Sequence, residues 1–340
     1  MKIGRFTLTI LATAAVMLFA VSFAQAQNNR SWVSSTGDDN AACTRTAPCR
    51  TFQGAHNKTN PQGEIDVIDA GEYSNAVSNV GAISAVLSLT ITKSITIDGG
   101  GLGFITGGNA NGADAVVVNV TDLHDVVTLR QLSINGVHVG GVPSAFFDGV
   151  RFGSGGATAG SLVLEHCQIS NFSRGAVNFT PSSGGSLFVR DCEFTNNEFF
   201  GIQAQSTTSG VATCSIDNVR ASNNGIFGTG SGFQFFQRTQ AIVSDSVVSF
   251  NGLNGIQASP QAGTAEVNIE STNVVGNNIN LQAGFSAAPA TIRISNVDIF
   301  DATANGLTWT AGSNILSFGN NRIAGNVGSN GPPSGTLPQQ

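Results

Sequence analysis

A short motif returns about every 25 residues through the second half of the chain, and this repeat constrains the fold more than any other feature. The motif is a glycine followed by an apolar, a polar and an apolar residue, as in Gly255-Ile256-Gln257-Ala258. Its copies begin at Gly149, Gly175, Gly201, Gly232, Gly255, Asn280 and Gly306, at intervals of 26, 26, 31, 23, 25 and 26 residues. Such self-similarity predicts a stack of structural units.

A second column keeps the same period. It consists of Asn171, Asn196, Asn223, Asn251, Asn277 and Asp301. Four residues earlier lies a small, mostly apolar position, filled by Cys167, Cys192, Val219, Val247, Asn273 and Val297, which we expect to point inward. Asparagine tolerates the left-handed conformation and its amide can bond to the next copy, so we interpret the asparagine column as structural.

Each copy alternates with period two, which is typical of strands, and no helical pattern separates the copies. Short strands with polar turns predict an all-β fold, a single right-handed parallel β-helix over residues 61–327, whose coils stack at about 4.8 Å. Two inward columns are expected: Val150, Val177, Ile202, Phe233, Ile256, Leu281 and Leu307; and Phe152, Phe179, Ala204, Phe235, Ala258, Ala283 and Trp309. The outward column between them is Arg151, Asn178, Gln203, Gln234, Gln257, Gln282 and Thr308.

Residues 1–26 have the pattern of a secretory signal peptide. Lys2 and Arg5 precede an apolar run over 10–23, and Ala24-Gln25-Ala26 forms a small-residue cleavage pattern. The run is short for a membrane anchor, the alternative reading, because a bilayer span needs about 20 residues. Cleavage leaves a net charge of 13 − 21 = −8. An acidic exported chain argues against nucleic acid or an anionic membrane as partner.

The two ends of the mature chain depart from the repeat. Residues 27–60 should form an N-terminal cap, with a short helix over 49–58 and strands following at 64–69, 89–92 and 94–97. In an oxidising compartment Cys43 and Cys49 are expected to form a local disulfide, with two free thiols as the alternative. Residues 328–340 lack apolar periodicity and are predicted to be disordered.

The other three cysteines fall on inward columns. Cys167 and Cys192 share one column, and Cys214 is assigned to the column of Leu162, Leu187 and Ile242. Stacked coils hold β-carbons farther apart than the roughly 3.8 Å that a disulfide prefers. We therefore predict three buried free thiols.

The stacked Gly-Ile-Gln-Ala strands, the asparagine column and the opening segment over 49–55 (Cys-Arg-Thr-Phe-Gln-Gly-Ala) resemble the pectin-lyase-like superfamily of right-handed parallel β-helix proteins of exported bacterial type. The resemblance covers nearly all of the mature chain. It implies a β-helix closed by a cap helix, but it is weak for function, because the superfamily includes lyases, hydrolases, epimerases and non-enzymatic adhesins. Its hydrolases use paired aspartates, and its lyases use aspartate-bound calcium with a basic arginine or lysine.

The outward column carries none of those catalytic sets, because it holds amides, Arg151 and no carboxylate. The best remaining candidates are Asp191 and Glu193, which would flank inward Cys192 at about 6–7 Å, a spacing at which carboxylates serve as acid and base. His166 and Arg220 would stack on them from the adjacent coils, and surface ion pairs Asp191–His166 and Glu193–Arg220 are the alternative. Glu165, Arg190 and Asp217 form a similar alternating-charge column.

Two functions therefore compete. The first is an exported, non-catalytic β-helix that binds a glycan or serves as an envelope or surface scaffold. The glycan would bind along the amide column from Arg151 to Gln282, because amides bond sugar hydroxyls well. The alternative is that these amides bond only to each other as a stabilising ladder. The second is a polysaccharide lyase or glycoside hydrolase with a non-standard site. Three pairs of phenylalanine could offer a sugar platform, with stacking in the core as the alternative: Phe146-Phe147, Phe199-Phe200 and Phe235-Phe236. His56, His124, His138 and His166 show no metal-binding spacing, so no metal or cofactor is predicted.

Overall fold

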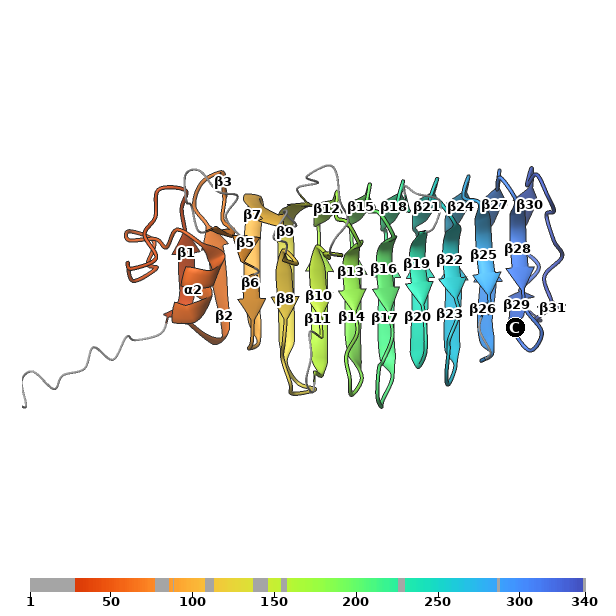
Figure 1. Ribbon diagram of the computed structural model, residues 1–340, viewed down its shortest axis with the longest axis horizontal. Helices are drawn as coiled ribbons and strands as arrows, with labels where there is room; N and C mark the ends of the chain where they lie inside the picture. Colours follow the sequence, from red (N-terminus) through yellow and green to blue (C-terminus); the bar gives the residue numbers. More distant parts are fainter. Residues whose placement is uncertain are drawn as a thin grey trace, which may run out of the picture.

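The computed structural model describes residues 28–76, 86–87, 89–107, 113–136, 146–153, 158–225, 230–285 and 288–338. The chain winds into a long parallel β-helix, whose coils follow one another along the long axis from the N-terminal to the C-terminal end (Figure 1). The all-β solenoid expected from the repeat is confirmed. The predicted signal peptide and His138 lie outside the described residues.

One face of the solenoid is a nine-stranded parallel sheet, with one strand per coil. Its strands are β6 (Leu89–Ile91), β8 (Val116–Val118), β10 (Val150–Phe152), β13 (Gly175–Phe179), β16 (Phe200–Ala204), β19 (Ser231–Phe235), β22 (Asn254–Ala258), β25 (Ile279–Ala283) and β28 (Asn305–Trp309). We call this surface the amide face, after the outward column that crosses it from Arg151 to Thr308.

The rest of the wall is a 20-stranded sheet that follows the coils in two ladders. The first ladder contains β1 (Asn28–Val33), β2 (Thr59–Val67), β7 (Ile95–Gly107), β9 (Val126–Gly136), β11 (Gly160–Glu165), β14 (Gly185–Arg190), β17 (Ala212–Asp217), β20 (Thr239–Ser244), β23 (Ala265–Glu270), β26 (Ala290–Ser295), β29 (Asn314–Ser317) and β31 (Gly335–Thr336). The second contains β3 (Gly71–Glu72), β12 (Gln168–Ser170), β15 (Glu193–Thr195), β18 (Arg220–Ser222), β21 (Val247–Ser249), β24 (Asn273–Val275), β27 (Asp298–Phe300) and β30 (Arg322–Ala324), while long β7 and β9 take part in both. A separate antiparallel pair joins β4 (Asn75–Ala76) to β5 (Val86–Leu87).

The predicted register of the amide face is confirmed. Gln203 is the strand partner of Gln234, Gln234 of Gln257 and Gln257 of Gln282, so the four glutamines form one line across adjacent coils. Ile256, next to Gln257, is fully buried. The alternation read from the sequence therefore assigns the sides of this sheet correctly.

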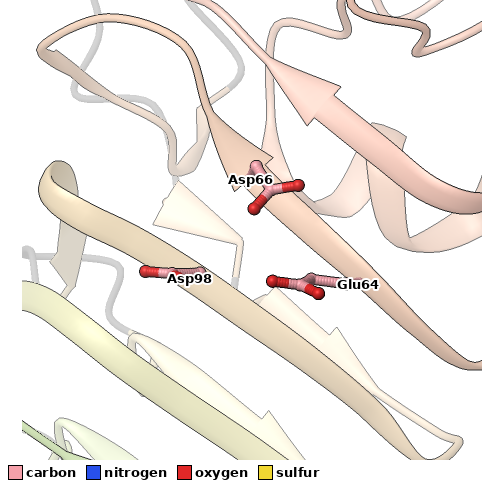
Figure 2. Close-up of side chains that lie close together, drawn as sticks. All are labelled: Glu64, Asp66 and Asp98. Carbon is pink, nitrogen blue, oxygen red and sulfur yellow. The ribbon is translucent and has the colours of Figure 1, made fainter.

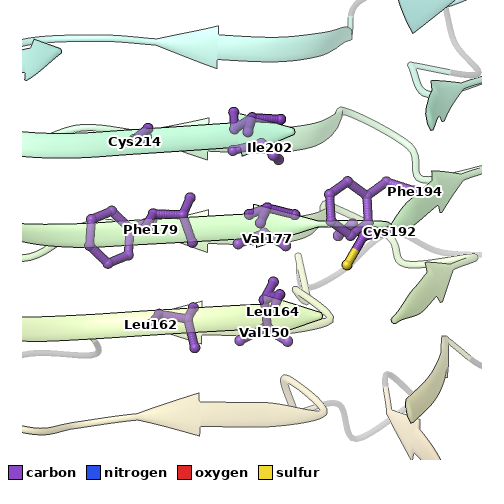
Figure 3. Close-up of a cluster of buried hydrophobic side chains, with 14 of the residues drawn as sticks. Val150, Leu162, Leu164, Val177, Phe179, Cys192, Phe194, Ile202 and Cys214 are labelled. Carbon is purple, nitrogen blue, oxygen red and sulfur yellow. The ribbon is translucent and has the colours of Figure 1, made fainter. Parts of the chain in front are cut away.

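The inward columns form the core (Figure 3), in which Val150, Val177 and Ile202 stack from coil to coil. Phe152 and Phe179 continue the second column with ring centroids 4.8 Å apart. Trp309, which was expected inside, is an exception, because 37% of it is exposed. It lies on β28, which pairs with β25 and ends the sheet, so no further strand of the sheet covers the indole.

The asparagine column turns out to combine two positions. Asn171, Asn196 and Asn223 adopt positive φ at a corner, as expected, and Asp301 does the same in a later coil. Asn251 and Asn277 instead belong to a buried ladder one residue further on, with Asn197 and Asn224. The 28-residue step from Asn223 to Asn251 concealed this change, and Phe250 and Gly276 occupy the left-handed corner in those coils.

Three inward assignments of the cysteine columns were also wrong by one residue. Val247 and Asn273 pair with Arg220 and Asp298 on the outer side, and buried Ser246 and Thr272 take the inward position. Cys214 pairs with Leu187 as predicted, but its next partner is Ala241, and 53% of Ile242 is exposed. Asp245 and Ser271, turn residues with positive φ, precede Ser246 and Thr272 and interrupt the simple alternation there.

The cysteine predictions themselves agree with the structure. Cys43 and Cys49 form a disulfide, and Cys167, Cys192 and Cys214 are buried free thiols. Each of the three thiols packs in the core like a small hydrophobic side chain.

The N-terminal cap contains helix α2 (Phe52–Lys58), which contacts β1, β2 and β6. Thr51 caps it by accepting a hydrogen bond from the backbone N–H of Gly54, and Phe52, Ala55 and His56 are buried beneath it. The cap segment also supplies β1, which pairs parallel with β2, so the solenoid wall begins before residue 61. The strands expected at 64–69, 89–92 and 94–97 correspond to parts of β2, β6 and β7.

The C-terminal tail was predicted to be disordered, but residues 328–338 lie against the last coil. Gly335–Thr336 forms β31 beside β29, and Ser334 bonds to the backbone of Ile315. Backbone pairing at the open end of the sheet, which needs no apolar pattern, accounts for the difference. Across the described segments, no helix is long and apolar enough to cross a membrane.

Candidate functional site

The outward column of the amide face is in register but unevenly exposed. Asn178 is 1% exposed and Gln257 8% exposed, so these two amides are largely covered. The side-chain amide of Gln257 donates to the side-chain oxygen Oε1 of Gln282 at 3.0 Å. The side-chain amide of Gln203 donates to Oδ1 of Asn178 at 3.4 Å. Part of the column is therefore a ladder of amides that bond to each other, and the freer polar surface lies near Gln203 and Gln234.

An aromatic groove of about 190 Å³ opens beside these two glutamines. It is lined by Phe146, Arg174, Phe199, Phe200, Gln203 and Gln234. Phe146 and Phe199 meet edge to face with centroids 5.2 Å apart, and the guanidinium of Arg174 lies 5.8 Å from the ring centre of Phe200. The groove thus combines aromatic walls, a cation and amides, whereas Phe235, also expected to offer a platform, is fully buried.

A cluster of two carboxyl groups and two guanidinium groups lies immediately behind this groove, and we call it the Asp148 cluster. It comprises Asp114, Asp148, Arg151 and Arg174. Arg174 Nη1 lies 3.4 Å from Asp148 Oδ2, and Arg151 Nη1 lies 3.6 Å from Asp114 Oδ2. The backbone N–H of Asp148 donates to Asp114 Oδ1 at 2.8 Å, which joins the two pairs.

Burial makes Asp148 chemically unusual. Its side chain is fully buried, and Asn178 donates to its Oδ2 at 2.8 Å. Among the described residues, its Oδ1 and the Nε of Arg151 are buried without a hydrogen-bond partner. Desolvation raises the pKa of Asp148 to about 7, against the opposing effect of Arg174, and desolvation also raises the pKa of Asp114. Near pH 7, Asp148 is therefore present in both its protonated and its ionised form.

Arg174 connects the cluster to two openings on the surface. Besides the aromatic groove, it lines a polar groove of about 400 Å³ with Arg151, Asn178 and the hydroxyls of Thr180, Ser182, Thr207 and Thr208. Its side chain is 27% exposed. A ligand in either groove would meet the same guanidinium that pairs with Asp148.

The sequence interpretation missed Asp114, Asp148 and Arg174. It searched the outward strand column for carboxylates, whereas Asp114 and Asp148 stand just before the strands, as Asp148-Gly149-Val150-Arg151 shows. The register places Asp114 beside Asp148, since Val116 pairs with Val150. The sequence feature that could have revealed them is an aspartate two residues before the first inward valine of two successive coils. Later coils carry Ser231 and Asn254 at this position.

The predicted acid–base pair lies at a different corner of the solenoid. Asp191 has φ 54° and lies in the turn before β15, so it does not share a strand face with Glu193 as expected. His166 Nε2 is 3.4 Å from Asp191 Oδ2, as the ion-pair alternative predicted. Glu193 and Arg220 are strand partners, but no ion pair within 4.0 Å joins them among the described side chains. All four residues line one shallow groove of about 440 Å³.

The neighbouring charge column is in register as predicted. Glu165 pairs with Arg190 and Arg190 with Asp217, and Arg190 Nη2 lies 2.8 Å from Glu165 Oε1.

Three carboxylates gather near the N-terminal end of the helix (Figure 2). Glu64 and Asp66 of β2 and Asp98 of β7 have carboxylate oxygens within 4.8 Å of one another. Arg130 lies 2.7 Å from Glu64 and 2.8 Å from Asp98, and Arg30 pairs with Asp66. Each of the three carboxylates is thus paired with a guanidinium group, so we interpret the cluster as an ion-pair network and not as a cation site.

Comparison with known proteins supports the fold. A family model described as a right-handed β-helix region matches residues 109–327. A phage CBA120 tailspike protein domain superposes with a TM-score of 0.56 at 11% identity, covering 81% of this chain and 40% of that one. The complex of XylC with xylose gives 0.55 at 10% identity, covering 91% and 72%. A GH136 lacto-N-biosidase from Eubacterium ramulus gives 0.51 at 14%, covering 92% and 67%. Curated protein sequences give no match.

Proposed function

Because the chain belongs to the right-handed β-helix family, we propose that it is an exported protein that binds an extended glycan across the amide face without cleaving it. The aromatic groove beside Gln203 and Gln234 forms the centre of this site. The basic leader and cleavage pattern over residues 1–26 support export to the periplasm or the cell exterior.

The aromatic groove carries this proposal. Phe146 is 51% exposed, which leaves an aromatic surface available to the apolar face of a sugar ring. Gln203 and Gln234 offer donors and acceptors to hydroxyl groups, and Arg174 offers charge-assisted hydrogen bonds. The superposed structures include proteins named for carbohydrates, xylose and lacto-N-biose among them, which agrees with a glycan as ligand.

The test is a glycan array followed by affinity electrophoresis on the glycans retained. Phe199→Ala and Gln234→Ala should each weaken retention at least about tenfold, which is 1.4 kcal/mol, with little change in melting temperature. Gln240→Ala, at an exposed glutamine on β20 of the other sheet, is the matched control and should retain the glycan. If the wild type retains no glycan, or if the control loses as much as Gln234→Ala, the groove is not the binding site.

A second candidate function, a polysaccharide lyase or glycoside hydrolase, is favoured by one observation. The pKa of Asp148 near 7 is the property required of a general acid or base at neutral pH. Release of new reducing ends or unsaturated uronates by the wild type, abolished in Asp148→Asn, would establish this activity. The catalytic roles suggested for Asp191, Glu193, His166 and Arg220 stay predictions, and Asp191→Asn with Glu193→Gln tests them in the same assay.

A further inference from the structure

Arg174 is placed so that one cation serves two partners. On its buried side it faces Asp148 at 3.4 Å, and on its exposed side it lines both grooves of the amide face. Guanidinium groups bind carboxylates and sulfates through paired hydrogen bonds, so an anionic glycan substituent in either groove would engage Arg174.

We infer that an anionic group of the glycan and the carboxylate of Asp148 compete for Arg174, so that an acidic glycan binds together with one proton taken up by Asp148. This inference rests on the proposed glycan-binding function and adds the ligand's charge and its regulation by pH. The proton comes from solvent and converts the Asp148 carboxylate to the carboxylic acid, and no other bond forms or breaks.

The surroundings of Asp148 explain why proton uptake follows. The charged groups that face it are Asp114 from the segment before β8, Arg151 from β10 and Arg174 from the segment before β13. Arg151 is engaged with Asp114 at 3.6 Å, so Arg174 is the ion-pair partner of Asp148. A buried carboxylate that loses its cation to a ligand keeps the cost of desolvation without compensation, and protonation removes that cost.

Protonation of Asp148 leaves its existing hydrogen bond from Asn178 in place. Asn178 holds Asp148 Oδ2, while Oδ1 has no partner in the described structure and can carry the added proton. The protonated acid then needs no cation. At low pH Arg174 is free for the ligand, and at high pH it is neutralised by Asp148.

The expected effect follows from the fraction of molecules with Asp148 protonated. With a pKa of about 7, about 3% of molecules are protonated at pH 8.5 and nearly all at pH 5.5. The Kd of an acidic probe should therefore be about 30-fold weaker at the higher pH. A neutral probe of the same sugar should bind equally at both.

The experiment is titration calorimetry with oligogalacturonate and oligomannuronate, each beside its methyl ester, at pH 5.5 and 8.5 in buffers of different ionisation enthalpy. Wild-type protein should take up close to one proton per acidic oligosaccharide at pH 8.5 and none with the ester. Asp148→Asn should bind the acid equally at both pH values without proton uptake. Asp217→Asn, an acid-to-amide change on β17 in the other sheet, is the matched control and should behave as wild type.

A second variant protects the test against misfolding of Asp148→Asn. Arg174→Gln should lose the preference for the acid over the ester while it still binds the ester through the aromatic groove. If the wild type binds the acids with one Kd at both pH values and without proton uptake, the inference is wrong but glycan binding stands. If wild-type protein binds none of the four oligosaccharides at either pH, the proposed function fails for these sugars and the inference falls with it.

Discussion

Replacement of Asp148 by asparagine should stabilise the protein at alkaline pH. The folded pKa of Asp148 is about 7, against 3.8 for an unperturbed aspartate, a difference of about three pH units. Because the folded pKa is raised, the folded state binds more protons than the unfolded state between pH 4 and 7, and stability falls as pH rises through that range. At 1.36 kcal/mol per unit, the ionised carboxylate costs about 4 kcal/mol above pH 8. Asparagine keeps an oxygen for Asn178 and carries no charge.

The assay is urea unfolding of both proteins at pH 4, 6 and 8, with the unfolding free energy taken by linear extrapolation. The difference between Asp148→Asn and wild type should move in favour of the variant by about 4 kcal/mol from pH 4 to pH 8, and most of that change should occur below pH 7. A pH-independent difference for Asp148→Asn would refute the claim that burial raises this pKa.

Two further predictions concern the cap and the core. Burial lowers the pKa of His56 to about 4 from 6.5, so stability should be complete above pH 6.5 and fall by up to about 3 kcal/mol as pH drops to 4; His56→Gln should flatten this profile in acid unfolding. Asn224→Ala should lower the unfolding free energy measured in urea by about 3 kcal/mol, because it removes a buried amide that bonds to Asn197, Asn251 and the backbone carbonyl of Phe194. Asn223→Ala, at the neighbouring left-handed corner, should lower it by about 1 kcal/mol. Equal losses of unfolding free energy in the two asparagine variants would contradict the claim that the hydrogen bonds of the buried ladder stabilise the fold.

The sequence was sufficient for the parts of the fold that repeat. Alternation fixed the glutamine register and the core columns, because a one-residue shift would have exposed every apolar side chain of the amide face. It failed at corners, where a left-handed residue breaks the alternation and where Asn251 was taken for the equivalent of Asn223. It failed also at the ends, because Trp309 lacks a covering strand and β31 pairs through backbone alone.

The Asp148 cluster could not be predicted from the sequence for a related reason. Asp148 and Asp114 precede their strands, so the period-two rule assigns them no side, and their chemistry depends on burial that composition does not reveal. Arg174 precedes a copy of the motif that contains one extra residue. This insertion moved Arg174 out of the outward column in which charged residues were sought. Only the stacking of three coils brings these residues together.

The distribution of unpartnered polar atoms argues for function on the amide face. Among the described residues, the buried side-chain atoms without a hydrogen bond belong to Asp148, Arg151, Asn254 and Thr308, which lie on or directly beside strands of the nine-stranded sheet. Elsewhere the buried asparagine ladder pairs its amides from coil to coil. Leaving such an atom unpaired costs about 1–3 kcal/mol. Because the buried asparagine ladder forms its hydrogen bonds from coil to coil, the solenoid itself does not require unpaired atoms on the nine-stranded sheet. Two of these atoms, Asp148 Oδ1 and Arg151 Nε, belong to the Asp148 cluster, so part of this cost falls beside the grooves in which we propose that the glycan binds.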